Sequence, residues 1–218
     1  MLNYQKNFIE FALNSGVLKF GEFTLKSGRT SPYFFNAGLF NSGSSMLQLS
    51  RFFAESIAAS NQSFDVLFGP AYKGITLACG TAMALAELTD QNVPFAYNRK
   101  EKKTHGEGGV TVGAALSGKI AIIDDVITAG TAIRESFDLI HSADATASAV
   151  FIALDRQERG QQGDTLSPYS AIQQVESEFN IPVIAIATMT HLIDYLKDNS
   201  DYAAHLPNMM QYREQYGI

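Results

Sequence analysis

The spacing of apolar positions changes at about residue 46 of the chain. Over residues 2–15 apolar side chains recur at helical spacing and end in Ser15-Gly16, which predicts an N-terminal helix. Residues 17–37 alternate between apolar and polar and contain the turn-rich sequence KSGRTSP, which predicts short strands or a hairpin. We therefore expect residues 1–45 to form a small N-terminal hood.

From residue 46 onward, apolar strands alternate with helical segments. The pattern predicts strands at FDVLFGP, PFAYNR, KIAIIDDV, ATASAVFIALDR and PVIAIATM. Helices are expected over residues 46–60, 74–91, 131–142 and 168–179, with two more helical segments after the last strand. This alternation indicates an α/β fold, with a central, mostly parallel five-stranded sheet flanked by helices, in residues 46–218. No linker rich in Gly, Ser or Pro separates it from the hood, so we expect the two parts to pack together.

Composition narrows the classes of function and partner. The 218 residues are 46% hydrophobic, enough for a substantial core, and their net charge is −6. This acidity argues against general binding to nucleic acid or to anionic membranes. The single cysteine, Cys79, excludes an internal disulfide, and the N-terminus lacks the pattern of a signal peptide. We expect a cytoplasmic protein without nucleic-acid or membrane partners.

Two adjacent acids end one of the predicted buried strands. Asp124 and Asp125 follow IAII directly, and ligands of open α/β sheets bind at the carboxyl ends of strands. Carboxylates there can accept hydrogen bonds from sugar hydroxyls or hold a divalent metal through water. The alternative is a pair of solvated acids before a capped helix. We favour it less, because the two acids end a buried apolar strand.

The loop after the acids has the features of a phosphate site. It runs into the N-terminus of a predicted helix, whose free N–H groups and dipole favour a phosphate. Gly130 permits close backbone approach, and Thr128 and Thr131 add hydroxyl donors. Neither a Walker A lysine loop nor a GxGxxG after a strand is present. Together, acids and loop predict a site for a ribose that carries a terminal phosphate.

The sequence IAIIDDVITAGTAIRES resembles the phosphoribosyl pyrophosphate (PRPP) signature of type I phosphoribosyltransferases. LKSGRTSPYFFNAGLF, LFGPAYKGI, NRKEKKTHGEGG and LDRQERG extend the resemblance, over essentially the whole chain, to the bacterial orotate phosphoribosyltransferases. The resemblance implies the type I fold, with the hood over the active site. It also implies Mg²⁺-dependent transfer of the 5-phosphoribosyl group from PRPP to orotate, in pyrimidine biosynthesis. The products would be orotidine 5′-monophosphate and pyrophosphate, and the active unit a homodimer with a loop shared across subunits.

The segment GPAYKG follows the strand FDVLFGP and so lies at the same edge of the sheet as the acids. Gly69, Pro70 and Gly74 shape a tight loop, and its N–H groups and Lys73 suit an anion. The resemblance assigns pyrophosphate to this loop, with contacts from Tyr72 and Lys73, and implies an unusual peptide bond in it. From the segment alone, an ordinary strand-to-helix turn with an exposed lysine stays open.

The segment NRKEKKTHGEGG combines positive charge with glycine, which is typical of a mobile loop over residues 99–109 that closes on an anion. A solvated hairpin is the alternative, but an acidic protein that binds PRPP needs local positive charge. By resemblance, the PRPP contacts are Arg99, Lys100, Lys103 and His105. We expect Lys102 to be solvated.

A pyrimidine needs a flat apolar wall and a few hydrogen bonds at its edge. The resemblance assigns Phe34 and Phe35 to orotate and Lys26 to the reaction centre, although Tyr33 and both phenylalanines could instead be hood core. Arg156 ends a predicted strand and can grip a carboxylate or carbonyl; the resemblance places it on orotate.

The resemblance thus implies three overlapping sets of residues. Catalytic roles fall to Lys26, Lys73, Lys103, Asp124 and Asp125. PRPP binding falls to Lys26, Tyr72, Lys73, Arg99, Lys100, Lys103, His105, Asp124, Asp125, Val126, Ile127, Thr128, Ala129, Gly130, Thr131 and Ala132. Orotate binding falls to Lys26, Phe34, Phe35, Thr128 and Arg156. Mg²⁺ is expected to be held mainly by PRPP and water, near Asp124 and Asp125, with no direct protein ligand.

Two rival functions fit part of the pattern. A phosphoribosyltransferase for a purine base would share the PRPP signature but would have a different hood, without YFFN. A PRPP-sensing regulator could dispense with the basic loop and would carry a basic surface for nucleic acid. The chain keeps RKEKKTHGEGG and is acidic elsewhere, which favours the orotate enzyme.

Overall fold

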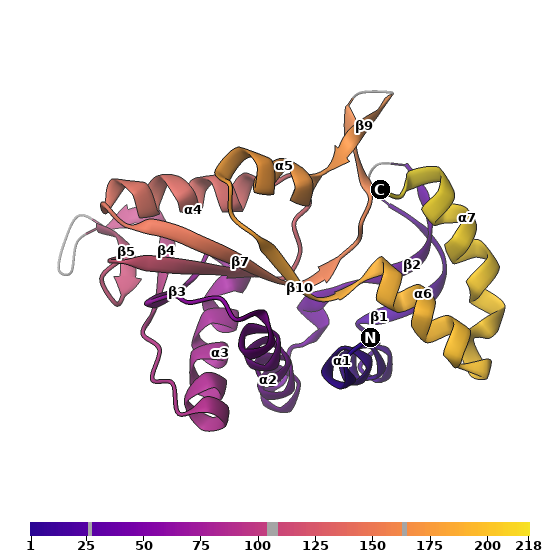
Figure 1. The fold of residues 1–218 in the computed structure, drawn as a ribbon, viewed down its shortest axis with the longest axis horizontal. Coiled ribbons are helices and arrows are strands. Elements are labelled where there is room, and N and C mark those ends of the chain that lie inside the picture. The colour runs from indigo at the N-terminus through magenta and orange to yellow at the C-terminus, as the bar shows by residue number, and fades with distance from the viewer. Residues whose placement is uncertain (26–27, 104–108, 163–164) are drawn as a thin grey trace.

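Figure 1 shows the computed structural model of the chain, which describes residues 1–25, 28–103, 109–162 and 165–218. The side chains at 102, 103, 161 and 162 also lie outside the description. The predictions for Lys26 and His105, and for the side chain of Lys103, therefore fall outside the described residues.

A six-stranded sheet in the order β10-β7-β6-β3-β4-β5 forms the centre of the fold. Five of its strands are parallel, as the sequence predicts, but a sixth strand pairs antiparallel with β4 at one edge and was not expected. The described strands of this sheet are β3 (Val66–Gly69), β4 (Phe95–Lys103), β5 (Gly109–Gly113), β6 (Lys119–Asp124), β7 (Thr146–Asp155) and β10 (Val183–Thr188).

Helices cover both faces of the sheet (Figure 1). On one face lie α2 (Gly43–Ser60) and α3 (Lys73–Thr89), and on the other lie α4 (Thr131–Ser142) and α5 (Ala171–Phe179). Phe53 and Leu85 belong to the buried cluster of the first face, and Ile133 and Val175 to that of the second. A sheet that is buried on both faces explains why its strands read as continuous apolar runs. Among the described residues, none of the helices has both the length and the apolar character needed to cross a membrane.

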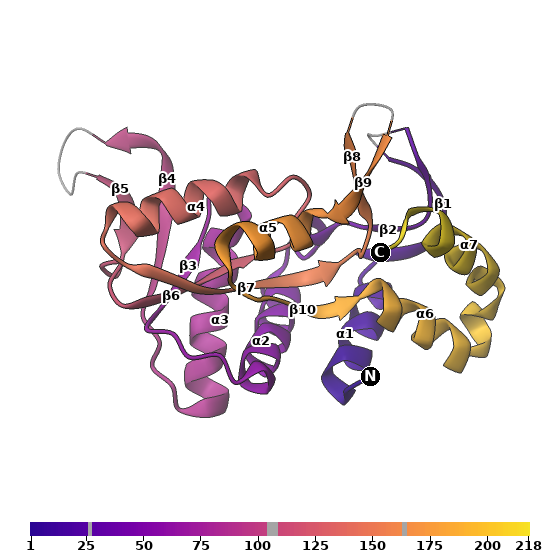
Figure 2. The same cartoon turned by 45° about the horizontal axis from the view of Figure 1, so that its top comes forward.

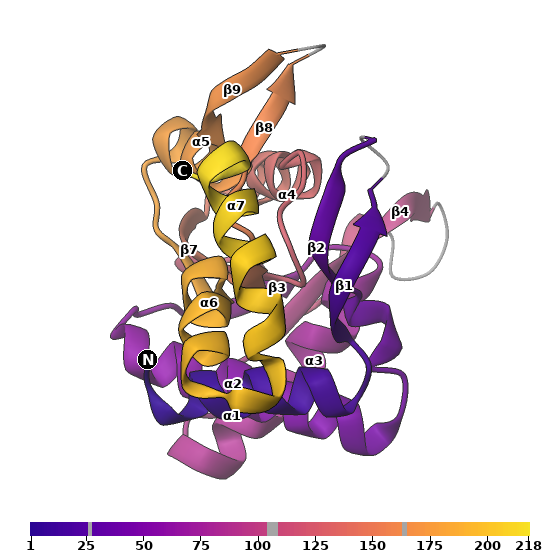
Figure 3. The same ribbon diagram turned by 90° about the vertical axis from the view of Figure 1, so that its right-hand side faces the viewer.

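The hood contains α1 (Asn3–Asn14), the antiparallel strands β1 (Leu18–Thr24) and β2 (Thr30–Phe35), and the short helix η1 (Ala37–Leu39). The last elements of the chain, α6 (Met189–Asp198), η2 (Ser200–His205) and α7 (Leu206–Tyr216), lie beside these strands (Figure 3). Phe8 and Tyr33 of the hood share one buried cluster with Leu67 and Phe151 of the sheet. Hood and sheet therefore pack together, as expected.

A second hairpin, β8 (Arg159–Gln162) and β9 (Thr165–Ser170), stands beyond the end of β7. Figure 2 shows it at the same end of the molecule as the β1–β2 hairpin, and Arg29 Nη1 donates to the carbonyl of Arg159 at 3.2 Å between them. The sequence pattern missed this hairpin and started the helix of residues 168–179 three residues early. The helix begins at Ala171 because the Ser170 hydroxyl caps it by accepting from the Gln173 N–H.

Candidate active site

The two acids lie where the sequence predicted, at the carboxyl end of β6. Asp125 is buried, and its N–H donates to Asp124 Oδ1 at 2.8 Å. The carbonyl of Asp125 accepts from the N–H of Ala153 in the neighbouring strand β7 at 2.9 Å. The sheet thus fixes the backbone of the two acids, so what can change at this point of the site is the state of their carboxylates.

Burial and the neighbouring charge of Asp125 raise the pKa of Asp124 to about 7. Lys73 acts in the opposite direction, but more weakly. Near neutral pH Asp124 therefore gains or loses a proton easily. A partner that brings positive charge or hydroxyl donors would favour the ionised form.

The loop GPAYKG meets the acid pair directly. Lys73 is the first residue of α3, and its Nζ donates to Asp125 Oδ2 at 2.6 Å. The side chain of Lys73 is more than half exposed, whereas that of Asp125 is mostly buried. The contact joins two segments that the sequence placed at one sheet edge, and it leaves the ammonium accessible to an anion.

Close packing of two glycines shapes this loop. A Cβ on Gly69 would overlap the carbonyl of Gly74, and a Cβ on Gly74 would lie 2.7 Å from the carbonyl carbon of Gly69. The Ala71–Tyr72 peptide bond is cis, the unusual peptide that the resemblance implies. The Tyr72 side chain is 74% exposed at the edge of the site.

The structure adds a residue that sequence reasoning missed. Asn98 is buried in β4, and its Oδ1 accepts from the N–H of Ala71 at 2.7 Å. The bond fixes the start of the GPAYKG loop from the neighbouring strand. A polar side chain at the end of the apolar run PFAYN was the only signal in the sequence.

The second anion loop runs from Val126 to Gly130 and leads into α4. Gly130 has φ +73°, the left-handed conformation that favours glycine, and is buried, whereas Thr128, Ala129 and Thr131 are exposed. No side chain of the described residues caps the N-terminus of α4, nor that of α3. Two helix N-termini with free N–H groups therefore open at this edge, one beside Lys73 and one beside the acids.

Arg134 braces this loop from the first turn of α4. Its Nη1 donates to the carbonyl of Ala129 at 2.8 Å, and its Nε donates to Glu178 Oε2 of α5 at 2.9 Å. The carbonyl of Gly130 accepts from the Arg134 N–H at 3.0 Å. The loop is thus held in the shape that presents its N–H groups.

The basic segment begins as a strand and not as a loop. Residues 99–103 form the end of β4, and Lys103 pairs with Gly109 of β5. Arg99 Nη1 donates to the carbonyl of Gly109 at 3.4 Å, and Lys100 Nζ donates to Glu135 of α4 at 3.1 Å. The contact ties Lys100 to α4, the helix that follows the loop Val126–Gly130. Closure of a lid over residues 99–109 stays a prediction.

The two hood phenylalanines differ in exposure. Phe34 is 39% exposed and its ring lies 5.5 Å from that of Phe23. Phe35 packs on the hood core 6.3 Å from Phe8, and Tyr33 is fully buried. Tyr33 therefore belongs to the hood core, and Phe35 does so in part, whereas Phe34 exposes an aromatic surface.

Arg156 follows the end of β7, at the same edge as the acids. Its Nε donates to Glu158 Oε1 at 2.9 Å and to the Tyr33 hydroxyl at 3.2 Å. Burial alone would lower its pKa, but the neighbouring Tyr33 and Glu158 outweigh that effect and raise it, so the guanidinium stays charged. Arg159 has a structural contact, because its Nε donates to the carbonyl of Gly217 at 3.0 Å.

The described residues contain no cluster of three or more His, Cys, Asp or Glu side chains that could hold a metal by themselves. The donor set at the site is two carboxylates beside two helix N-termini that suit phosphates. That set fits Mg²⁺, which usually keeps several waters and binds one or two carboxylates together with substrate phosphates.

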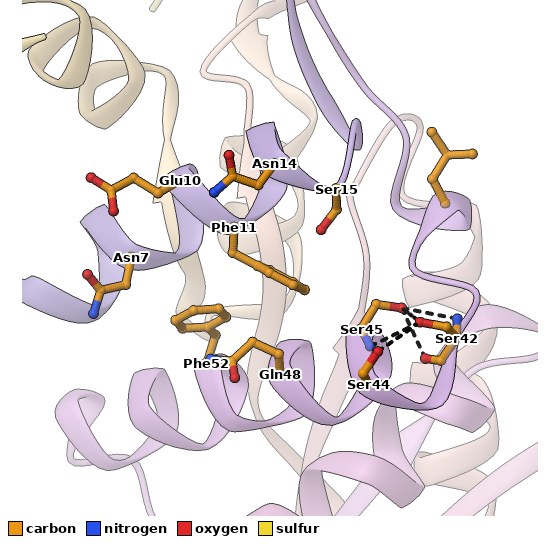
Figure 4. Close-up of a pocket in the computed structure, with 11 residues that line it drawn as sticks. Asn7, Glu10, Phe11, Asn14, Ser15, Ser42, Ser44, Ser45, Gln48 and Phe52 are labelled. Carbon is orange, nitrogen blue, oxygen red and sulfur yellow. Dashed lines mark hydrogen bonds between the residues drawn. The ribbon is translucent and has the colours of Figure 1, made fainter.

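An open hollow of about 710 Å³ lies elsewhere, between α1 and the start of α2 (Figure 4). Phe11, Phe52 and polar side chains such as Glu10 and Gln48 line it. The acids, Lys73 and the phosphate loop are absent from its lining, so the chemistry described above does not belong to it.

Comparison with known proteins agrees with this geometry. A family model described as the phosphoribosyl transferase domain matches residues 40–182. Orotate phosphoribosyltransferase from Marinobacter nauticus is 60% identical over 219 residues, and that from Pseudomonas syringae pv. tomato is 58% identical over 218 residues; both matches cover 100% of this chain and 100% of the relative. The crystal structure of orotate phosphoribosyltransferase from Francisella tularensis has a TM-score of 0.88 and 44% identity, covering 97% of this chain and 100% of that one. The chain therefore belongs to the phosphoribosyltransferase family, among the orotate phosphoribosyltransferases.

Proposed function

We propose that this chain transfers the 5-phosphoribosyl group of PRPP to orotate, with Mg²⁺, and releases orotidine 5′-monophosphate and pyrophosphate. The observation that carries the proposal is the 2.6 Å contact between Lys73 and Asp125. It joins two anion loops and an acid pair at one edge of the sheet. A substrate with a phosphate at one end, a diphosphate at the other and a ribose between them matches that arrangement.

We assign each group of PRPP to the part of the site whose charge suits it. The 5′-phosphate binds the loop Val126–Thr131 and the N-terminus of α4, with Ala132 in the first turn. The ribose hydroxyls donate to Asp124 and Asp125. The pyrophosphate binds the loop with Tyr72 and Lys73 at the start of α3. Arg99, Lys100, Lys103, His105 and Lys26 complete the set as expected contacts of PRPP.

Orotate is proposed to lie between the hood and this edge. Phe34 offers an aromatic surface and Arg156 a charged donor for a carboxylate or carbonyl. Phe35, Lys26 and Thr128 complete the expected contacts. Orotate would then approach C1 of the ribose from the hood side.

The chemistry needs no protein nucleophile. N1 of orotate gives up its proton and forms a bond to C1 of the ribose while the bond from C1 to the pyrophosphate oxygen breaks. The electron pair of that bond leaves with pyrophosphate, and the proton goes to the solvent or to the released pyrophosphate. Negative charge grows on the leaving group, where Lys73, Lys103 and Lys26 stabilise it. Asp124 and Asp125 fix the ribose for this displacement. When bound, Mg²⁺ would neutralise charge on the phosphate oxygens; Asp124 and Asp125 are the residues that would hold it, through water.

We also propose that the active unit is a cytoplasmic homodimer in which the basic loop serves the neighbouring subunit. Exposed apolar side chains on the neighbouring helices α2 and α3, among them Leu47 and Met83, support an interface between copies. The single cysteine supports a reducing compartment.

Base selectivity tests the proposal. Purified protein is mixed with Mg²⁺, PRPP and one of three bases, orotate, adenine or hypoxanthine, and absorbance is followed. Loss of orotate absorbance with orotate alone is the expected result. Turnover with a purine would favour the purine enzyme, and tight PRPP binding without turnover of any base would favour a regulator.

A further inference from the structure

A cluster of buried polar side chains surrounds Arg156 and has no part in the assignments above. Glu158 Oε1 accepts from Arg156 Nε at 2.9 Å and lies 2.8 Å from Nη2. Only 30% of the Arg156 side chain and 12% of the Glu158 side chain is exposed. The carboxylate oxygen thus accepts a hydrogen bond from Nε and forms an ion pair with Nη2, which is buried and makes no hydrogen bond among the described residues.

Tyr33 of the hood closes the cluster from the opposite side. Its hydroxyl donates to Glu158 Oε1 at 3.0 Å and accepts from Arg156 Nε at 3.2 Å. The guanidinium carbon lies 5.1 Å from the centre of the Tyr33 ring. Burial, reinforced by Glu158, raises the pKa of Tyr33, so the phenol keeps its proton and acts as a donor. Tyr212 of α7 stands edge-on at 6.4 Å from the Tyr33 ring.

The loop that carries these residues is anchored on both sides. The carbonyl of Gln157 accepts from the Ile218 N–H at 3.1 Å, and Gln157 Oε1 accepts from the Thr190 N–H at 2.8 Å. Glu158 also forms a β-bridge with Gly217. A carboxylate on so constrained a backbone can fix the direction of its partner.

This geometry leaves one end of the guanidinium for a ligand. Nε donates to Glu158 Oε1, and Nη2 is buried 2.8 Å from the same oxygen without a hydrogen bond. Nη1 makes no hydrogen bond within the described residues either, but it is not fully buried and can be reached by a ligand. Arginine grips planar anions through a rigid fork, so an error in its direction costs affinity. A freely rotating Arg156 would have to be ordered each time the base binds.

We propose that Glu158, together with Tyr33, is a positioning residue for orotate: it holds the guanidinium of Arg156 so that Nη1 is presented to the planar anionic base. The inference rests on the proposed contact between Arg156 and orotate. Glu158 acts through Arg156 and does not itself touch the base, because its own negative charge would repel an orotate carboxylate.

Two substitutions separate position from charge. Glu158→Gln removes the charge but keeps an oxygen that can accept from Nε, so we expect the KM for orotate to stay within about threefold of the wild-type value. Glu158→Ala removes the oxygen as well and releases the guanidinium, which we expect to raise the KM for orotate about tenfold. The KM for PRPP is expected to stay unchanged in both variants.

Two further variants complete the design. Tyr33→Phe, which removes only the hydroxyl, should raise the KM for orotate by less than Glu158→Ala, again without a change for PRPP. Asp194→Ala is the matched control, because it removes the partner of Lys197 on the surface of α6, and it should change neither KM. Thermal unfolding checks each variant, and Tyr33→Phe carries the test if Glu158→Ala does not fold.

A double-substitution cycle shows whether Glu158 acts through Arg156. In the Arg156→Gln background, Glu158→Ala should cause no further rise in the KM for orotate. An unchanged KM for orotate in Glu158→Ala, or an equal rise for PRPP, would overturn the positioning role while Arg156→Gln still shows the contact with orotate. If Arg156→Gln itself leaves the KM for orotate unchanged, the proposed contact is wrong and the positioning role is wrong with it.

Discussion

Single residues at the end of β6 form the acidic part of the proposed site, and the two acids there are not equivalent. Asp125 is paired with Lys73, whereas burial and the charge of Asp125 raise the pKa of Asp124 to about 7. Substitutions of the two carboxylates should therefore differ in their effect on stability.

Asp125→Asn should fold normally and lose most of its activity. The change keeps the volume but removes a carboxylate that holds Lys73 and is proposed to accept a ribose hydroxyl. Loss of one well-placed charged contact costs about 2–4 kcal/mol in the transition state. Steady-state rates of the purified variant measure this loss, and near-normal turnover would mean that the acid pair is structural.

Asp124→Asn should stabilise the protein at alkaline pH. Burial raises the pKa of Asp124 in the folded state, so the unfolded chain ionises this group first as pH rises. The free-energy cost of Asp124 to the folded state therefore grows with pH up to about pH 7. Above that pH the cost stays constant, at about 1–3 kcal/mol. Asparagine has no charge to bury and keeps an oxygen for the Asp125 N–H.

Thermal unfolding at pH 8 and pH 5 measures this effect. The Tm of Asp124→Asn should exceed the wild-type Tm by several degrees at pH 8 and by clearly less at pH 5. Asp138→Asn, at an exposed position of α4, is the control and should leave Tm unchanged at both pH values. A lower Tm for Asp124→Asn at pH 8 would contradict a raised pKa.

The sequence did not predict the residues that act through contacts with positions far away along the chain. Asp124, Asp125 and Lys73 end strands or begin helices, so their positions follow from the order of elements. Asn98 acts on a backbone N–H 27 residues away, and Glu158 meets a tyrosine 125 residues away. No local pattern encodes such a pairing.

At the level of elements, the strands with continuous apolar runs were predicted, including β10 at one edge of the sheet, whereas β5 at the other edge and the β8–β9 hairpin were not. Strands β3, β6 and β7 are buried on both faces of the sheet, which produces a strong pattern. Strand β10 is only partly buried, but its residues 183–187 are all apolar. The missed strands, β5 and the β8–β9 hairpin, lie at an edge or outside the sheet. These segments form strands because of the strands with which they pair, and their own composition does not predict them.

The close contact between β3 and α3 makes a prediction about the first anion loop. Gly69→Ala should destabilise the fold by about 1–3 kcal/mol and weaken PRPP binding, because its Cβ would overlap the backbone of Gly74. The control is Gly43→Ala, where an added Cβ meets nothing within 4 Å. Thermal unfolding and PRPP titration of both variants test this, and equal behaviour would show that the loop adapts.

For the whole molecule, the proposed crossing of loops between subunits can be tested by mixing inactive variants. Lys103→Ala and Asp125→Asn are combined in equal amounts, and subunits are allowed to exchange. With crossing loops, one site of each mixed dimer collects both defects and the other collects neither. Random exchange makes half the dimers mixed, so roughly a quarter of normal activity should return. Confirmed exchange without recovery would mean that each loop serves its own subunit.

The central claim is transfer of the phosphoribosyl group to orotate and not to water. Its most direct measurement is the amount of pyrophosphate released from PRPP, with Mg²⁺ present, against the amount of orotate consumed. We expect one pyrophosphate and one orotidine 5′-monophosphate for each orotate consumed, and no pyrophosphate release above the uncatalysed rate when orotate is left out. Pyrophosphate release without orotate, or orotate left unchanged while PRPP is bound, would contradict it.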